Sequence, residues 1–371
     1  MSREQVPAVS SEVTFSLDAA YYTSEAIYQK ECSNLFARTW QYAGHVSQVT
    51  KPGDYFSFDI AGQNLFCIRD GNNVLHTFYN VCQHRAHQIV EGQGEGKKTL
   101  VCPYHAWSYH LDGHLLRGPN TEVVPAEVRE KICLSPVRTQ EFCGFIFVNL
   151  DDDADPMENW YPGVEAELRD FVPQIDRLAP VETIRVDEKC NWKVSVENYS
   201  ECYHCRLNHR TFSTGVVKPD TYDIQPQGYC LRHTTECQNL EKMTYPIDLS
   251  SNKHAGDYSS WYLWPTFSFQ VYPGNVINTY HWQPTAVDAV TIARGWFTAE
   301  GISSAVIHDL AVQDRETTVE EDIDLVESQQ RGFNNRGYRP GPLVVDPKGG
   351  VNSEHSIKAL QQWMREAVTS T

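Results

Sequence analysis

Four side chains that commonly bind metals occur in two short and similar stretches of the chain. Cys82 is followed after one residue by His84, and Cys102 is followed after two residues by His105. Each stretch therefore supplies one thiolate and one imidazole. An iron–sulfur cluster uses this combination when two Cys hold one iron and two His replace Cys on the other. We therefore predict that Cys82, His84, Cys102 and His105 bind a [2Fe–2S] cluster.

The main alternative for these four residues is a structural zinc site with two Cys and two His ligands. Zinc fingers usually keep the Cys pair together and the His pair together, whereas Cys and His alternate in this chain. The alternation favours the iron–sulfur interpretation. His87 and His110 lie nearby, but the spacing leaves them outside the ligand set, and we interpret them as loop or interface residues.

A second set of metal-binding side chains lies in the segment NYSECYHCRLNH. On an irregular helix, His204 and His209 lie roughly on one side and can bind one metal ion. Two His and one carboxylate leave positions open for dioxygen and substrate, which suits non-haem Fe(II) oxygenases. Composition does not choose the carboxylate among the acidic residues of the segment 314–327: Asp314, Glu316, Glu320, Glu321, Asp322, Asp324 and Glu327.

Two other interpretations fit the second set less well. Cys202 and Cys205 could join His204 and His209 in a zinc site. However, Cys202 and His204 fall on different helix faces, and no second Cys pair follows. The two His could also be ordinary polar residues of a core, although a cluster motif in the same chain makes a second metal site the better interpretation.

Composition and charge exclude several classes of protein. A chain of 371 residues is long enough for two or three domains. The net charge of −17 argues against nucleic-acid binding, which needs clustered Lys and Arg. We expect no membrane association and a cytoplasmic location, because no apolar run approaches about 18 residues and the first residues lack a signal-peptide pattern. The odd number of Cys, eleven, fits a reducing compartment better than a disulfide framework.

The order of the predicted elements indicates an α+β fold class with two domains. We expect a helical segment at 1–39 that packs on the catalytic domain, an all-β domain at 40–150 that carries the first ligand set, and an α+β domain at 151–371. Predicted helices lie at 18–40, 161–178, 191–209 and 306–333, and predicted strands lie at 55–60, 64–70, 74–81, 143–150, 261–284 and 289–300.

At these motifs the chain resembles the catalytic (alpha) subunit of the Rieske non-haem iron oxygenases. The resemblance runs through NVCQHRAHQIV, TLVCPYHAWSY, NWKVSVENYSECYHC and DIDLVESQQRGFNNRGY. It implies a β-sandwich Rieske domain, a helix-grip catalytic domain in which an antiparallel sheet packs with helices, and a homotrimer. The family's E-D-x-x-x-V-E run falls on 321–327, which makes Asp322 the carboxylate ligand of the mononuclear iron.

The family usually places an Asp between the two centres, where it links a cluster His of one subunit to an iron-ligand His of the next. Glu201 occupies that position here, and the resemblance therefore implies an inter-subunit electron-transfer role for it. A Glu in this setting resembles the carnitine monooxygenase and quaternary-ammonium (betaine) demethylase branch. Those enzymes read CPHRGH where this chain reads CQHRAH at 82–87, and Gly-Pro-Ala where it has Arg206-Leu207-Asn208.

That branch implies an enzyme that hydroxylates a quaternary-ammonium or betaine-type small molecule with O2. Electrons would come from NAD(P)H through a separate flavin and iron–sulfur reductase. The chain itself has neither a dinucleotide fingerprint nor a plant-type ferredoxin Cys run. Hydroxylation of a carbon bonded to nitrogen is followed by collapse to an amine and an aldehyde, so an N-methyl group would leave as formaldehyde.

A trimethylammonium group donates no hydrogen bonds and is held by cation–π contacts with aromatic rings. The strand-rich segment from residue 261 onward supplies such rings, although each could equally be an ordinary core residue. We predict that the substrate contacts are among Trp261, Tyr262, Trp264, Phe267 and Phe269, with Tyr272 nearby. A betaine carboxylate would need a donor, for which Arg206, Arg232 and His233 are candidates.

Two rival functions remain at this point. An aromatic-ring hydroxylating or O-demethylating Rieske oxygenase would carry identical metal ligands, so only the pocket and Glu201 argue against it. A Rieske protein that only transfers electrons would need about the first 150 residues and would not carry His204, His209 and Asp322.

Overall fold

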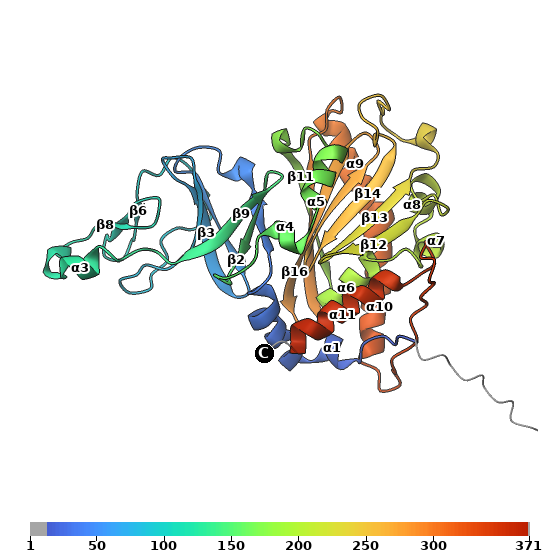
Figure 1. Ribbon diagram of the computed structural model, residues 1–371, viewed down its shortest axis with the longest axis horizontal. Helices are drawn as coiled ribbons and strands as arrows, with labels where there is room; N and C mark the ends of the chain where they lie inside the picture. Colours follow the sequence, from blue (N-terminus) through green and yellow to red (C-terminus); the bar gives the residue numbers. More distant parts are fainter. Residues whose placement is uncertain (1–12, 370–371) are drawn as a thin grey trace, which may run out of the picture. The chain divides into compact units, whose positions relative to one another are not determined.

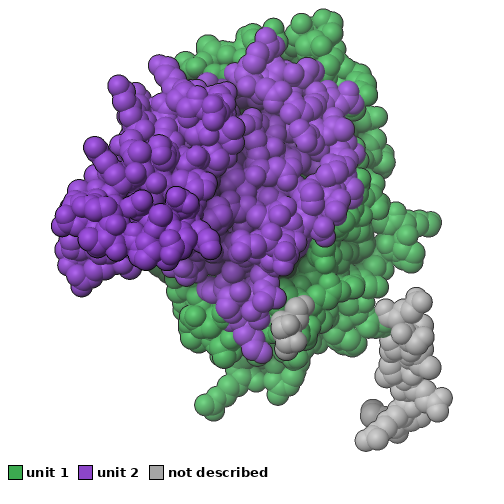
Figure 2. All heavy atoms as spheres, turned by 60° about the vertical axis from the view of Figure 1, so that its left-hand side comes forward, with its two compact units in different colours: residues 1–29, 181–371 green, residues 30–180 purple. Residues whose placement is uncertain are grey.

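The structure is a computed structural model that describes residues 13–369. The chain forms two compact units (Figure 2). We call residues 30–180 the β unit, and residues up to 29 together with those from 181 onward the α+β unit. The predicted limits at 39/40 and 150/151 differ from the limits of these units. Residues 1–12 of the predicted N-terminal segment lie outside the described residues.

Hydrogen bonds explain why the stretch after residue 150 belongs to the β unit. The indole of Trp40 donates to the carbonyl of Asp155 at 2.9 Å. The backbone N–H of Met157 donates to the side chain of Gln140 at 3.1 Å. This stretch is therefore tied to the sheet of the β unit.

An antiparallel seven-stranded sheet forms the body of the β unit (Figure 1). Its strands follow the order β1 (Gln41–His45), β10 (Phe145–Asn149), β9 (Pro136–Phe142), β4 (Leu75–Tyr79), β3 (Gln63–Arg69), β2 (Tyr55–Ile60) and β5 (Gln93–Gly94). A smaller sheet contains β6 (Leu100–Val101), β7 (Ser108–Tyr109) and β8 (Leu115–Arg117). The four strands predicted in this region are confirmed to within two residues at each end.

Short helices complete the β unit. They are η1 (Glu31–Phe36), η2 (Val46–Gln48), η3 (Thr121–Val123), α3 (Ala126–Arg129), α4 (Met157–Trp160), α5 (Val164–Phe171) and η4 (Ile175–Arg177). The helix predicted at 161–178 is therefore confirmed in its central part, as α5. This helix buries Val164, Leu168 and Phe171, which recur at the spacing of one helix face.

A second antiparallel seven-stranded sheet forms the centre of the α+β unit (Figure 1). Its order is β11 (Pro180–Glu188), β17 (Ala289–Phe297), β16 (Val276–Ala286), β15 (Phe267–Tyr272), β14 (Asp257–Leu263), β13 (Cys230–Glu236) and β12 (Asp223–Gln227). The helices are α1 (Ala20–Thr23), α2 (Glu25–Lys30), α6 (Trp192–Tyr199), α7 (Cys205–Asn208), α8 (Arg210–Gly215), η5 (Leu240–Lys242), α9 (Ser304–Asp314), η6 (Arg315–Val319), α10 (Glu320–Phe333) and α11 (His355–Thr369). The expected α+β class is confirmed.

Two predicted helices have a more complex form than expected. The prediction of one helix over 191–209 is wrong, because α6 ends at Tyr199 and α7 begins only at Cys205. The side chain of Glu201 accepts hydrogen bonds from the backbone N–H groups of Tyr203 and His204, which stabilises a turn instead of a helix. The long helix predicted at 306–333 is confirmed, with the π-helical turn η6 in its middle.

The first short helix packs on the α+β unit, whereas residues 30–39 of the predicted N-terminal segment belong to the β unit. The ring of Tyr22 stacks on Phe333 with centroids 4.0 Å apart. Its hydroxyl donates to the carboxylate of buried Glu197 at 2.7 Å. Among the described residues, no helix has the length and apolar character needed to cross a membrane.

Candidate metal centres and substrate cavity

The first ligand set lies on two loops of the β unit that share one backbone geometry. In one loop the N–H of Cys82 donates to the carbonyl of His87, and the N–H of Ala86 donates to the carbonyl of Cys82. In the other loop, Cys102, Ala106 and Trp107 repeat the same two bonds. Ala86 and Ala106 both adopt a left-handed backbone, with φ of 58° and 57°. The two loops therefore present their Cys in equivalent ways, whereas the His follows its Cys by two residues in one loop and by three in the other.

The side chains of these loops suit a [2Fe–2S] cluster. Cys82 and Cys102 are each 2% exposed. The rings of His84 and His105 lie 4.7 Å apart, and Nδ1 of His105 is buried without a partner among the described residues. Buried polar atoms are nearly always paired. An unpaired imidazole nitrogen beside two buried thiols fits a position facing a metal.

Aromatic residues hold this ligand set in place. The hydroxyl of Tyr109 lies 3.2 Å from Sγ of Cys82 and accepts a hydrogen bond from the N–H of Gln83. Trp107 stacks on His84 with ring centroids 4.6 Å apart and an angle of 7°. These contacts fix the orientation of one thiol and one imidazole before any metal binds.

The second ligand set converges in the α+β unit, although its members come from separate elements. His204 immediately precedes α7, His209 lies between α7 and α8, and Asp322 lies in the first turn of α10. Nε2 of His209 is 3.0 Å from Nε2 of His204 and 3.0 Å from Oδ1 of Asp322. One potential ligand atom from each residue lies within 4.8 Å of the others. The structure thus brings together two His and one carboxylate, the set expected for a facial triad.

Each of the two His also pairs with a carboxylate through its other ring nitrogen. Nδ1 of His204 contacts Glu201, and Nδ1 of His209 lies 2.9 Å from Oε2 of Glu321. Such carboxylate–His pairs fix the tautomer, so that Nε2 is the nitrogen available to a metal. Burial disfavours the charged form of His209, yet Asp322 and Glu321 outweigh burial and raise its pKa.

Glu321 is the site residue whose role sequence reasoning missed, because it was only one of several acidic candidates. The signal was its place directly before Asp322. The amide of Asn198 adds a hydrogen bond to Oδ1 of Asp322 at 3.2 Å. Asp314, another candidate, instead forms a buried ion pair with Arg294.

Cys202 and Cys205 are joined by a disulfide in the structure. Their sulfur atoms are therefore not available as ligands, and the alternative zinc site with His204 and His209 is not formed. The other nine cysteines are free thiols, and seven of them lie outside the first ligand set: Cys32, Cys67, Cys133, Cys143, Cys190, Cys230 and Cys237.

A small cavity of about 50 Å³ borders the second ligand set. His204, His209 and Asp322 form part of its wall. Aromatic side chains form much of the remainder: Tyr199, Phe212, Tyr222, Tyr258, Tyr272 and Tyr280. We call this the inner cavity.

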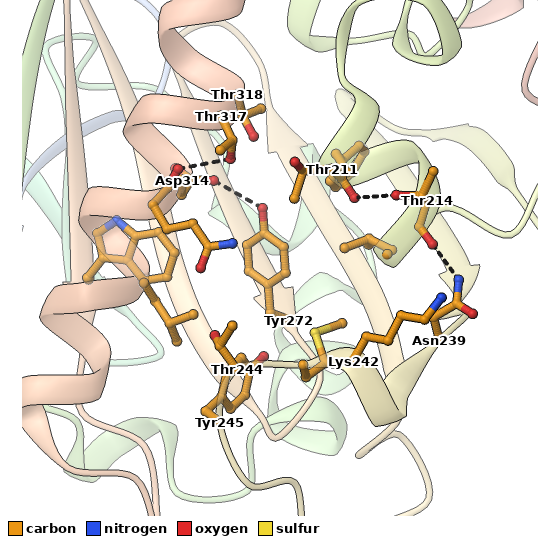
Figure 3. Close-up of a pocket in the computed structure, with 17 residues that line it drawn as sticks. Thr211, Thr214, Asn239, Lys242, Thr244, Tyr245, Tyr272, Asp314, Thr317 and Thr318 are labelled. Carbon is orange, nitrogen blue, oxygen red and sulfur yellow. Dashed lines mark hydrogen bonds between the residues drawn. The ribbon is translucent and has the colours of Figure 1, made fainter.

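A larger hollow of about 240 Å³, the outer pocket, adjoins the inner cavity and is drawn in Figure 3. Phe212, Tyr272 and Thr318 line both spaces. In the figure Tyr272 donates through its hydroxyl to Asp314, and Lys242 lies on the far side of the pocket from the α9–α10 segment. The inner cavity is therefore the smaller of the two spaces, and the outer pocket adds room beside it.

The five predicted substrate residues do not line the inner cavity or the outer pocket. In the sheet, His233 pairs with Ser260 and Ser260 with Gln270, so these side chains share a face. Trp261, Phe267 and Phe269 occupy alternate positions. Tyr262 shares the face of Ser260 but lies further along β14, and Trp264 follows the end of that strand. Side chains alternate between faces along a strand, and sequence reasoning did not establish which face was inward.

Tyr272, which the sequence placed near the predicted group, does line both spaces. Of the three candidate donors for a carboxylate, His233 lines the inner cavity, whereas Arg206 and Arg232 line neither space. Tyr258 and Tyr280 were missed. Tyr280 lies in a predicted strand, whereas Tyr258 precedes the strand predicted at 261–284.

The fold and the two ligand sets together define an oxygenase with a Rieske-type cluster and a mononuclear iron site. Comparison with known proteins agrees. The Rieske [2Fe–2S] domain model matches residues 39–128, and the model of the ring hydroxylating alpha subunit (catalytic domain) matches residues 175–370. The chain belongs to this family of Rieske oxygenase alpha subunits and is an oxidoreductase. Its cofactors are a [2Fe–2S] cluster and mononuclear iron, used with O2 and reductase-supplied electrons.

Several named proteins are similar over almost the whole chain. The carnitine monooxygenase oxygenase subunit of Acinetobacter baumannii is 32% identical, with 94% of each chain covered. The chloroplastic choline monooxygenase of Beta vulgaris is 28% identical, over 98% of this chain and 79% of the relative. A solved quaternary ammonium Rieske monooxygenase, described for carnitine oxidation and inter-subunit electron transfer, superposes with a TM-score of 0.84 at 30% identity, covering 96% of each chain.

Proposed function

We propose that the protein is the oxygenase component of a two-component monooxygenase that hydroxylates a quaternary ammonium compound. The observation that carries this proposal is the aromatic wall of the inner cavity beside His204, His209 and Asp322. Aromatic faces attract a cation that cannot donate hydrogen bonds. The similar carnitine and choline monooxygenases support the same substrate class.

We propose that each ligand set binds one of the two metal centres. Cys82, His84, Cys102 and His105 would hold the [2Fe–2S] cluster, and the triad would hold Fe(II). When bound, the two centres supply electrons and activate dioxygen for insertion into a C–H bond. The chain's own residues orient and bind: Glu201 and Glu321 fix the His tautomers, and the aromatic wall holds the ammonium group next to the triad.

The charge of the inner cavity also suits a cation. Glu201 and Asp322 line it, whereas no Lys or Arg does. Because the proposed Fe(II) would neutralise Asp322, the attraction of a positively charged head group rests on Glu201 and on the ring faces, which act in the same direction. Hydroxylation of a carbon attached to the nitrogen would then release an aldehyde and leave a tertiary amine.

We also propose a homotrimer in which Glu201 links His204 to a cluster-ligand His of a neighbouring subunit. The support is the family resemblance and the contact between Glu201 and Nδ1 of His204. A separate flavin and iron–sulfur reductase would supply electrons from NAD(P)H. We propose a cytoplasmic location because nine of the eleven cysteines are free thiols.

Turnover of the iron-loaded protein with a generic reductase and NADH tests the function. The substrates are carnitine, choline, glycine betaine and a set of aromatic acids, with products identified by mass spectrometry and a formaldehyde assay. The expected result is oxidation of a trimethylammonium compound with release of an aldehyde. Oxidation of aromatic acids alone would overturn the proposal and favour the aromatic-ring or O-demethylating alternative.

A pair of variants tests the aromatic wall itself. Tyr258→Leu should raise KM for the ammonium substrate by about 3- to 30-fold, since a cation–π contact contributes roughly 0.5–2 kcal/mol. Tyr258→Phe keeps the ring and should change KM much less. Phe269→Leu is the matched control, because Phe269 lies on the opposite face of the same sheet. Equal effects of Tyr258→Leu and Phe269→Leu on KM would contradict the assignment.

A further inference from the structure

His233 lines the inner cavity and has a buried ring nitrogen without a hydrogen-bond partner among the described residues. It lies on β13, is 4% exposed and lines the cavity. Its Nε2 has no hydrogen-bond partner among the residues that the structure describes. Buried polar atoms rarely stay unpaired, and an unpaired one at the wall of a binding cavity indicates a contact that a ligand completes.

The neighbouring polar group on the same face of the sheet is already engaged. Oε1 of Gln270 accepts from Nη2 of Arg294 at 3.3 Å, and its Nε2 donates to the hydroxyl of Tyr258 at 2.7 Å. Arg294 in turn pairs with Asp314. This network holds the amide of Gln270 in one orientation, whereas Nε2 of His233 has no such partner among the described residues.

The imidazole of His233 is uncharged in its surroundings. Burial, with a smaller contribution from nearby His355, lowers the pKa of His233 to about 3. A neutral imidazole offers one donor and one acceptor, and it cannot form an ion pair with a carboxylate.

The side chains around the inner cavity do not favour an anion either. Its ionisable wall includes the carboxylates of Glu201 and Asp322 and no Lys or Arg side chain. A substrate carboxylate placed beside His233 would therefore lose its hydration without a cationic side chain to pair with, and only the proposed Fe(II) would offset this cost. A hydroxyl group loses less hydration, and it can both donate to and accept from a neutral imidazole.

We propose that His233 binds an uncharged hydroxyl group of the substrate, which makes trimethylammonium alcohols the preferred class. The inference rests on the proposed function and adds the chemical identity of the group next to the ammonium. The aromatic wall recognises the cation, and His233 distinguishes a hydroxyl from an alkyl group or a carboxylate at the same distance.

Three probes of similar size separate these groups: choline, propyltrimethylammonium and glycine betaine. Binding is measured by calorimetry on the anaerobic, iron-loaded protein, and KM and kcat are measured with reductase. The wild type should bind choline at least about tenfold more tightly than either other probe, since a site built for a hydroxyl penalises its absence. The expected preference lies mainly in KM and stays constant from pH 6 to pH 9.

His233→Leu should abolish the preference for choline over propyltrimethylammonium while leaving propyltrimethylammonium binding unchanged. His233→Gln keeps a neutral hydrogen-bonding group and should retain an intermediate preference. His308→Leu is the matched control on the surface, where His308 pairs with Glu182. A purely structural role for His233 would instead weaken all three probes together.

The outcomes separate this inference from the proposed function. If no trimethylammonium probe binds the wild type, the proposed function itself fails. If the probes bind but His233→Leu keeps the preference for choline, or glycine betaine binds as tightly as choline, the inference about His233 is wrong. If His233→Leu does not fold, His233→Gln provides the test. An unchanged preference of His233→Gln for choline over propyltrimethylammonium would overturn the inference.

Discussion

The two ligand sets of this chain are built in different ways. In the β unit, four ligands lie within 24 residues on two loops of equivalent backbone geometry. In the α+β unit, His204 and His209 come from a broken helical segment and Asp322 comes from α10, more than 100 residues later. The first set is determined by local turns, whereas the second depends on the packing of distant elements.

This difference indicates how each site responds to change. The loops of the β unit carry their own hydrogen bonds, so a change in the α+β unit should leave their ligands in place. The triad has no such local frame. Its geometry relies on Glu201, Glu321 and Asn198, each of which contacts one ligand from a different position.

Removal of the distant carboxylate should have the largest effect. Asp322→Ala deletes one member of the triad, and we expect oxygenation to fall below detection while the visible absorption of the cluster is unchanged. The iron content should fall by the one mononuclear iron of each chain, while the two irons of the cluster remain. Asp324→Ala, on the exposed side of the same helix, is the control and should retain activity. Loss of the cluster absorption in Asp322→Ala would show that the two sites are not independently built.

Loss of a carboxylate that only supports a ligand should have a smaller effect. Glu321→Ala removes the partner of Nδ1 of His209, and we expect a decrease of about 10- to 100-fold in iron affinity or activity. Metal titration and kcat measure this. Glu320→Ala changes an exposed residue that pairs with Arg315, and it should stay near the wild type. Equal activity of the two variants would show that Glu321 does not support His209 as a ligand.

The α+β unit also contains a pH-dependent contribution to stability at Glu197. Burial raises the pKa of Glu197 to about 7, although hydrogen bonds from Tyr22 and Gln361 oppose this. The protonated form is favoured in the folded state, so this stability is present below pH 4.5 and is lost as the pH rises through about 7. The free energy of unfolding of Glu197→Gln should therefore exceed that of the wild type by about 1 kcal/mol at pH 8. At pH 4 the two proteins should be equally stable. Chemical unfolding at both pH values measures this, and an equal gain at both would contradict it.

The smallest expected effect concerns the local frame of the β unit. Ala86 adopts a φ of 58°, a conformation that Gly reaches without steric cost. Ala86→Gly should stabilise the protein by about 0.5–1 kcal/mol, with the cluster spectrum unchanged. The effect is modest because Gly also increases the entropy of the unfolded chain. A destabilised variant would show that the left-handed backbone at this loop is imposed by something other than the loop itself.

The same contrast explains which features the sequence could predict. The cluster ligands follow from spacing, because neighbouring residues on a tight loop meet regardless of the remaining fold. Asp322 could be selected only through resemblance, since composition left seven carboxylates open. Of the predicted substrate residues, Trp261 and Phe269 lie on the face of the sheet opposite Tyr258. These residues are equally aromatic, and only the register separates them. The break after Tyr199 was missed because helical periodicity does not reveal a side chain that caps a turn.

A single-turnover experiment tests the central claim, that one chain both stores the electrons and oxygenates a quaternary ammonium compound. The protein is reduced chemically, freed of reductant and mixed with O2 and a trimethylammonium substrate in the absence of any reductase. The account predicts one burst of hydroxylated product or released aldehyde, accompanied by oxidation of the cluster, and no burst from Asp322→Ala. Oxidation of the cluster without product in the wild type, with substrate bound, would contradict it.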